Sequence, residues 1–346
     1  MMRLPLFEFR TPSTVEEAAR VLDGEGANVM LLAGGTDLLP NMKRRQQVPH
    51  TLISLRNVQR LRAVHFDAAG ALLGACVKLS EVEADPRYRN GYSALWQAAA
   101  QVATLHIRNL ATLGGNVCLD TRCLYYDQSY EWRKAINFCR KKEGDTCWVA
   151  PGSERCMAVS STDTAPALIA LDARVLLKSR SEEREVALAD LYNNDGVKYL
   201  ARRHNEILSE IRLGVSHGWR STYWKLRRRG SFDFPVLSVA AAARLSHGVV
   251  EEAKIVLGAV ASRPLVADEA AKVLLGRKLD REAIAEAAAL ASRIAKPLSN
   301  ADFDMSWRKR VASEFVKYAL RELRGDDMRA ERRQLLGHDW DLPISA

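Results

Sequence analysis

Residues 119–158 constrain the fold more than any other part of the chain. They contain four of the six cysteines, with the spacing C-x15-C-x7-C-x8-C, and many aromatic and basic residues, but they show little periodicity. A loop of this length inside a compact domain is uncommon unless it is functional or disordered, and cysteines and aromatic residues are not typical of disorder. We therefore expect a metal centre to replace the missing hydrophobic core, with these ligands: Cys123, Cys139, Cys147 and Cys156.

The cysteine spacing alone leaves the kind of centre open. The closely spaced cysteine pairs of zinc sites and the spacings of ferredoxins are both absent. An iron–sulfur cluster, a zinc site and free or redox-active thiols are all compatible with the pattern. Of the other two cysteines, Cys76 is expected in a strand as a small core residue. Cys118 lies next to the segment, where packing in the core is favoured over a fifth thiol near the site.

Two glycine pairs stand at the ends of predicted elements. The first lies in Ala33-Gly34-Gly35-Thr36-Asp37 and the second in Thr112-Leu113-Gly114-Gly115-Asn116. Glycine permits positive φ and lets backbone N–H groups approach an anion, so both turns are candidates for binding the phosphates of a cofactor. Neither fits G-x-G-x-x-G or the Walker pattern, so a standard nucleotide-binding fold is not indicated, and a purely structural turn remains the alternative.

The 346-residue chain has the composition of a globular protein of two or three domains. No apolar run reaches the roughly 20 residues that cross a bilayer, and the first ten residues lack the apolar centre of a signal peptide. We therefore expect a cytoplasmic protein without a membrane partner, in which clustered cysteines bind metal rather than form disulfides. The net charge of +9 comes without a nucleic-acid-reading motif, so no nucleic-acid partner is expected.

Local patterns predict a chain of helices and strands. Ser13 and Glu16 form a capping-box pattern for a helix at about 14–22. Asp163 opens a helical stretch, either as an N-cap or as a ligand of a cofactor sugar hydroxyl. Strands are expected at 29–32, 51–55, 72–77, 223–226 and 256–260, and helices at 93–105, 266–275, 280–295 and 306–323.

Together these motifs resemble the FAD-binding medium subunit of the xanthine oxidase family of molybdenum hydroxylases, over about residues 7–323. The two glycine turns resemble that family's two FAD-pyrophosphate loops, and a stretch from Val256 to Ala270 resembles its C-terminal domain. Asp163 matches an aspartate on the flavin's ribityl chain, and Lys225 matches a lysine near the flavin. The resemblance implies no catalytic residue on this chain and these FAD-binding residues: Leu32, Ala33, Gly34, Gly35, Thr36, Asp37, Leu38, Thr112, Gly114, Gly115, Asn116, Asp163 and Lys225.

The resemblance also implies an α+β fold and a domain division. The FAD-binding domain would cover 1–218, in two subdomains at about 1–58 and 59–218, with a cluster-binding insertion at 119–158. A smaller α+β domain at 219–325 and a polar tail at 326–346 would follow.

The run from Asn116 to Cys123, followed by Tyr126-Asp127-Gln128-Ser129, resembles one branch of that family. This branch comprises the β subunits of 4-hydroxybenzoyl-CoA reductases, which carry an extra [4Fe–4S] cluster. The resemblance therefore implies a [4Fe–4S] cluster on the four cysteines. It implies an electron relay between an external partner, this cluster, FAD and a small subunit with two [2Fe–2S] clusters, next to a large molybdopterin subunit, in a dimer of heterotrimers.

Ferredoxin is the expected external partner, and Arg140, Lys141 and Lys142 are expected to dock its acidic surface. The resemblance favours reductive dehydroxylation of 4-hydroxybenzoyl-CoA, with the substrate site on another subunit. The alternatives are a molybdenum hydroxylase of another aromatic or heterocyclic substrate, a stand-alone flavoprotein reductase, and a zinc-stabilised binding module without a redox function.

Overall fold

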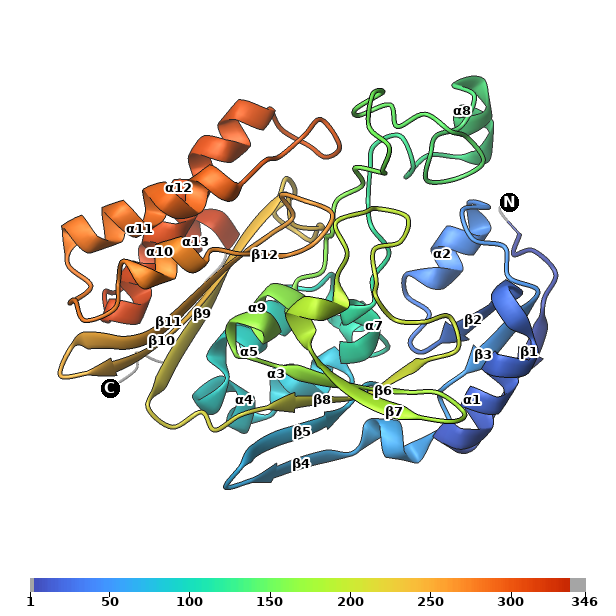
Figure 1. Cartoon of the computed structure of the whole chain (residues 1–346), viewed down its shortest axis with the longest axis horizontal. Helices are drawn as coiled ribbons and strands as arrows, with labels where there is room; N and C mark the ends of the chain where they lie inside the picture. Colours follow the sequence, from blue (N-terminus) through green and yellow to red (C-terminus); the bar gives the residue numbers. More distant parts are fainter. Residues whose placement is uncertain (1–2, 337–346) are drawn as a thin grey trace.

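The computed structural model describes residues 3–336. Within this range the strands form three separate sheets of three, five and four strands, with helices packed beside them (Figure 1). Among the helices of the same range, none combines the length and the apolar character that crossing a membrane requires. The prediction of an α+β fold is confirmed.

The first sheet is parallel and has the order β1-β3-β2. Helix α1 (Val15–Gly24) is the crossover that two parallel strands need, and its apolar side packs against β3 and its surroundings. Its N-cap is Thr14, whose hydroxyl accepts from the N–H of Glu17 at 3.1 Å, so the predicted cap at Ser13 and Glu16 is wrong by one residue. The other elements here are β1 (Glu8–Arg10), η1 (Gly26–Asn28), β2 (Val29–Leu32), α2 (Leu38–Lys43), β3 (Thr51–Ser54) and η2 (Gln59–Arg62).

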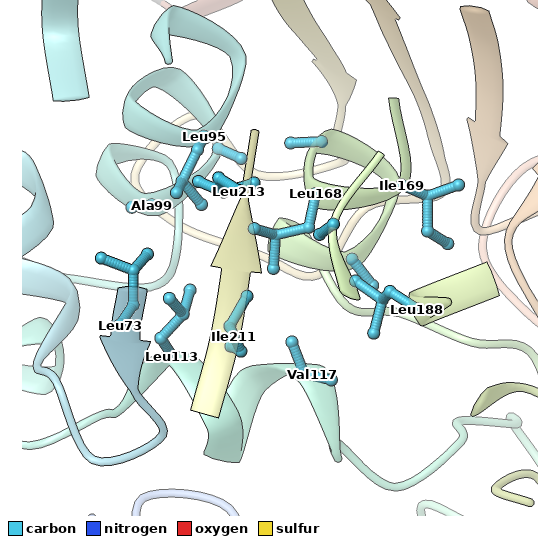
Figure 2. Packing of buried hydrophobic residues seen from close by; sticks show 14 of the residues in the cluster. Leu73, Leu95, Ala99, Leu113, Val117, Leu168, Ile169, Leu188, Ile211 and Leu213 are labelled. Carbon is cyan, nitrogen blue, oxygen red and sulfur yellow. The ribbon is translucent and has the colours of Figure 1, made fainter. Parts of the chain in front are cut away.

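The second sheet is antiparallel throughout and has the order β4-β5-β8-β6-β7. Leu73 and Ile211 of this sheet pack against Leu95, Leu113 and Leu168 from the helices (Figure 2). Its strands are β4 (Val64–Asp67), β5 (Gly70–Gly74), β6 (Arg174–Lys178), β7 (Glu183–Ala187) and β8 (Ile207–Leu213). Its helices are α3 (Leu79–Ala84), α4 (Pro86–Gly91), α5 (Ser93–Ala100), α6 (Leu105–Arg108), α7 (Leu113–Val117), α9 (Thr164–Ala170) and η3 (Leu188–Leu191).

Cys76 lies in the turn after β5 rather than in a strand, although it is buried as predicted. The predicted strand at 72–77 is shorter than expected because the chain turns after Gly74, where a side chain would overlap the backbone of Leu61. The helix predicted at 93–105 ends earlier, as α5 at Ala100, and the separate helix α6 begins at Leu105 with the Thr104 hydroxyl as its cap.

The third sheet is antiparallel, has the order β12-β11-β10-β9, and contributes buried residues to two separate cores. Trp224 and Val239 face α11 and α12, whereas Tyr223 and Ala240 face the core shared with α5 and α9. Alternate residues of a strand point to opposite faces, so this sheet joins the two cores. The elements are β9 (Trp219–Leu226), β10 (Leu237–Ser246), β11 (Val249–Gly258), β12 (Leu265–Val266), α10 (Asp268–Lys272), α11 (Arg281–Ile294), α12 (Met305–Arg324) and α13 (Arg329–Leu336).

The predicted polar tail begins as the packed helix α13. Arg332 of this helix is buried, with its guanidinium 4.1 Å from the ring centroid of Trp224 and bonded to Glu322 at 2.9 Å and to Thr222 at 2.9 Å. The remainder of the predicted tail, 337–346, lies outside the described residues.

The segment 119–158 stands beside the sheets and carries one helix, α8 (Tyr130–Ala135) (Figure 1). Its two ends are held together at its base, because Arg122 and Val159 exchange backbone hydrogen bonds of 2.8 and 2.7 Å. Buried Arg133 donates to the carbonyl of Arg44 at 3.0 Å, and Leu124 N–H donates to the carbonyl of Asn300 at 3.0 Å. The segment is therefore fixed to both α2 and the loop before α12.

Candidate functional site

A cavity of about 490 Å³ lies between the two glycine turns. The first turn follows β2 and leads into α2, and the second forms the first turn of α7, where the Thr112 hydroxyl accepts from the N–H of Gly115 at 3.1 Å. A side chain at Gly34 would overlap the carbonyl of Leu110, so the turns approach each other as only glycine allows. We call this space the glycine cavity.

Most of the predicted FAD-binding residues line the glycine cavity, but three do not. Leu32 ends β2, Gly114 is packed against Ala75, and Lys225 lies behind Asp163. Gly115, in contrast, is exposed to the cavity. The predicted residues that the structure brings together on the wall are Ala33, Gly34, Gly35, Thr36, Asp37, Leu38, Thr112, Gly115, Asn116 and Asp163.

Asn116 ties the second glycine turn to the turn that carries Asp163. Its side-chain oxygen accepts from the Thr162 hydroxyl at 2.8 Å, from the Thr164 hydroxyl at 2.7 Å and from the Thr164 N–H at 3.0 Å. All of these groups are buried. The position of Asp163 in the wall is therefore fixed by the second turn.

Asp163 precedes α9 but makes no side-chain capping bond, so the N-cap interpretation of this residue is not met. Instead, it accepts from the hydroxyl of Tyr223 at 2.6 Å and lies 3.0 Å from the ammonium of Lys225. Burial raises the pKa of Asp163, with Lys225 opposing the rise, and burial lowers the pKa of Lys225. A carboxylate held in this way presents a fixed acceptor at the cavity wall.

Arg122 lies at the point where the glycine cavity meets the cysteine segment. Its guanidinium forms an ion pair with Asp37 of the first glycine turn and lies 3.3 Å from Asp127. It also stacks over Phe234, with 4.5 Å to the ring centroid. Sequence reasoning missed Arg122 and Phe234, because no local pattern marks a contact between residues so distant in the chain.

The four predicted metal-ligand cysteines are all buried and line one small cavity, which we call the cysteine cavity. Its wall also includes the aromatic residues Tyr125, Tyr126 and Trp148 and the basic residues Arg140 and Lys141. The cavity that the thiols share has a volume of about 10 Å³. Within residues 3–336 no group of three or more His, Cys, Asp or Glu side chains is arranged to hold a metal ion.

Burial raises the pKa of Cys123 to about 12 and that of Cys156 to about 11. The four thiols of this polar segment lie together around one cavity, whereas the other buried cysteine, Cys76, packs alone in an apolar core. A metal centre bound to the four thiols would remove their protons, since thiolates are the ligating form.

The expected ferredoxin-docking surface is corrected at one position. Lys141 does not face solvent; its ammonium is buried against Asp120 at 2.8 Å. Arg140 donates to the carbonyl of Glu154 at 3.2 Å, and Lys142, which is 30% exposed, lies 3.7 Å from Glu143. Lys141 was expected at the surface because it lies in a polar run, but the buried carboxylate opposite it is distant in the chain.

Comparison with known proteins identifies the family. Residues 5–215 match the FAD binding domain in molybdopterin dehydrogenase, and residues 221–323 match the CO dehydrogenase flavoprotein C-terminal domain. The FAD-binding subunit of aldehyde oxidoreductase from Escherichia coli K12 is 31% identical over 263 residues, which cover 73% of this chain and 80% of that protein. The carbon monoxide dehydrogenase medium chain of Hydrogenophaga pseudoflava is 27% identical over 318 residues, which cover 91% of this chain and 96% of that protein.

The fold agrees with these matches. The crystal structure of cyanide-inactivated Cu,Mo-CO dehydrogenase superposes with a TM-score of 0.78 and 26% identity, over 93% of this chain and 99% of that chain. The expected two-part architecture, an FAD-binding domain followed by a C-terminal domain of this type, is confirmed. The chain therefore belongs to the family of FAD-binding medium subunits of molybdenum hydroxylases, and it is the FAD subunit of an oxidoreductase of that type.

Proposed function

We propose that this FAD subunit relays electrons between FAD in the glycine cavity and a [4Fe–4S] cluster in the cysteine cavity. The observation that carries the proposal is the convergence of all four cysteines of the 119–158 segment on one buried cavity. Iron–sulfur clusters are held by four cysteine thiolates, and the chemistry of this donor set matches that requirement. The cluster would supply single-electron transfer when bound.

The glycine cavity fits FAD in size and in chemistry. Its volume of about 490 Å³ lies within the ~300–1,000 Å³ usual for cofactor sites. Backbone N–H groups of the two glycine turns would hold the pyrophosphate, and Asp163 would accept from a ribityl hydroxyl. FAD, when bound, exchanges two electrons in one step or singly. Hydrogen bonds of Asn116 and Lys225 hold the second glycine turn and the Asp163 carboxylate in place for the cofactor.

The partners of the chain are also part of the proposal. We propose a large molybdopterin subunit, a small subunit with two [2Fe–2S] clusters, and a dimer of these heterotrimers in the cytoplasm, with ferredoxin as the external donor. The two matched relatives carry the names of enzymes for different substrates, aldehyde and carbon monoxide. This difference supports the proposal that a subunit other than the FAD subunit selects the substrate. The domain limits at 218 and 325 and the 119–158 insertion are retained in this proposal.

For the whole complex we propose reductive dehydroxylation of 4-hydroxybenzoyl-CoA. The support is the cysteine cavity, because a cluster there gives a low-potential donor a separate point of entry. The second candidate is a molybdenum hydroxylase of another aromatic or heterocyclic substrate, which the names of the two relatives favour because both are oxidising enzymes. Turnover of the thioester with reduced ferredoxin, against turnover of heterocycles with an oxidising dye, separates the two.

The first test is chemical analysis of the complex purified without oxygen. We expect about four iron and four sulfide per chain beside one FAD, and an EPR signal after reduction with dithionite. Cys139→Ser should lose that signal and keep FAD, whereas Cys76→Ser, a buried thiol outside the cysteine cavity, should keep both. FAD without iron, or one zinc in place of iron, would contradict the cluster and leave the FAD assignment intact.

A further inference from the structure

One buried ion pair separates the glycine cavity from the cysteine cavity. Asp120 lines the glycine cavity, whereas Lys141 and Tyr126 line the cysteine cavity. The ammonium of Lys141 lies 2.8 Å from one carboxylate oxygen of Asp120, and the hydroxyl of Tyr126 donates to the other at 3.1 Å. The two cavities therefore share a wall with a cation on one side and an anion on the other.

The ammonium of Lys141 is held in place by several groups. It also donates to the hydroxyl of Thr121 at 2.7 Å and to the carbonyl of Gly196 at 2.6 Å, so its three donors are all engaged. It lies 4.8 Å from the ring centroid of Tyr126 and 5.5 Å from that of Tyr199, another residue of the glycine-cavity wall. These contacts fix the distance of the charge from both cavities.

The surroundings make the pair electrostatically effective. The side chains of Lys141 and Asp120 are only 5% and 7% exposed. Solvent screens buried charges much less than surface charges, so each should act on the nearest redox centre. A neighbouring cation stabilises the more negative, reduced state of a centre and raises its reduction potential, and a neighbouring carboxylate lowers it.

We propose that Lys141 and Asp120 set the reduction potentials of the two centres in opposite directions. Lys141 raises the potential of the centre held by the four cysteines, and Asp120 lowers that of the flavin in the glycine cavity. Both are positioning residues that act on the centres through their fixed charges. This inference rests on the proposed function, because it takes the cysteine centre and FAD as the groups that are tuned.

The test is a redox titration of the complete complex, followed by EPR for the cysteine centre and by visible absorption for FAD. Lys141→Met should lower the midpoint potential of the EPR signal. Asp120→Asn, which keeps the size of the side chain, should raise the midpoints of both centres. Lys142→Met is the matched control, because this adjacent ammonium is partly solvated, and it should leave both midpoints at the parental values.

A merely structural pair would not give shifts of opposite sign. The proposal is overturned if Lys141→Met and Asp120→Asn move the EPR midpoint in the same direction, or if neither differs from Lys142→Met while iron and FAD stay at parental levels. If Lys141→Met loses iron, Asp120→Asn alone tests the proposal. Midpoints above the parental values then support it, and midpoints at or below them overturn it. Parental complex without iron overturns the cluster assignment itself, and the absorption titration of Asp120→Asn then tests the flavin part alone.

Discussion

The ammonium of Lys225 lies 3.0 Å from the carboxylate of Asp163, and the two side chains are 0% and 4% exposed. Lys225 belongs to β9 and Asp163 to the turn before α9, so the pair joins the third sheet to the wall of the glycine cavity. Lys225 also donates to the carbonyl of Gln101 at 3.0 Å. A resemblance placed both residues near a flavin, and the structure adds that they act as one unit.

Replacing one partner of this pair should destabilise the chain more than replacing both. Lys225→Met leaves the buried carboxylate of Asp163 without its cation, and the free energy of unfolding should fall by about 3–5 kcal/mol. The double variant Asp163→Asn/Lys225→Met should recover most of this loss while FAD content stays low, because the carboxylate acceptor is missing. Urea unfolding and FAD content after desalting measure the two effects.

The control for this prediction is Lys272→Met, which breaks an exposed pair with Glu269. Its effect on the free energy of unfolding should stay within about 0.5 kcal/mol, since surface pairs contribute little. Equal stability of Lys225→Met and Lys272→Met would show that the buried pair has no structural role.

Local signals predicted much of the fold, and contacts between distant segments limited the rest. Most of the ranges predicted for helices and strands overlap an observed element of the same kind, because periodicity and capping are encoded within a few residues. The glycine turns were found for the same reason. Other elements, among them β4, β7 and β8, had no predicted range. Lys141 was misplaced because its partner Asp120 and its acceptor Gly196 lie far from it in sequence. Only the folded chain brings such groups together, and α13 was missed for a similar reason, since its buried Arg332 pairs with a residue of α12.

The two glycine turns should respond differently to an added side chain. A Cβ at Gly115 would meet only the Thr112 hydroxyl, at 2.8 Å, and a larger side chain would extend into the glycine cavity. Gly115→Val should therefore lose most FAD while the chain still folds. Gly34→Ala should instead lower the unfolding midpoint, since its Cβ would overlap the backbone of Leu110. FAD content and urea unfolding of the FAD-free chains distinguish the two, and full FAD in Gly115→Val would refute the turn assignment.

Cys76 should make the stability of the chain depend on pH. Burial raises the pKa of this thiol from about 9 to about 12. Between pH 9 and pH 12 the Cys76 thiol is ionised in the unfolded chain and protonated in the folded chain. Its contribution to the free energy of unfolding is therefore fully present below pH 9 and falls as the pH rises. From pH 7 to pH 10 the thiol should account for a loss of about 1.4 kcal/mol.

Comparison of Cys76→Ala with Val77→Ala isolates this effect. Both truncations lie in the core, but only the first removes a titratable group. The difference in the free energy of unfolding between Cys76→Ala and the parent should shrink by about 1.4 kcal/mol from pH 7 to pH 10, whereas that for Val77→Ala should stay constant. Urea unfolding under anaerobic conditions at both pH values is the measurement, and parallel behaviour of the two variants would contradict it.

Gly196 supports the cysteine cavity from outside the 119–158 segment. Its N–H donates to the carbonyl of Cys156 at 2.9 Å, and its own carbonyl accepts from Lys141. A Cβ at this position would lie 2.7 Å from the sulfur of Cys156 and 2.9 Å from the backbone nitrogen of Ala158, closer than real Cβ contacts allow. Gly196→Ala should therefore displace the Cys156 thiol.

The expected result is that Gly196→Ala loses most of its iron, because one of the four ligands is out of place, while FAD content stays at the parental level. Gly152→Ala provides the matched control within the cysteine segment, since a Cβ there would meet no atom within 4 Å. It should keep both iron and FAD. Iron and FAD analysis of the anaerobic complexes measures the outcome. Equal iron in the two variants would contradict the prediction that Gly196 positions Cys156 as a ligand of the centre.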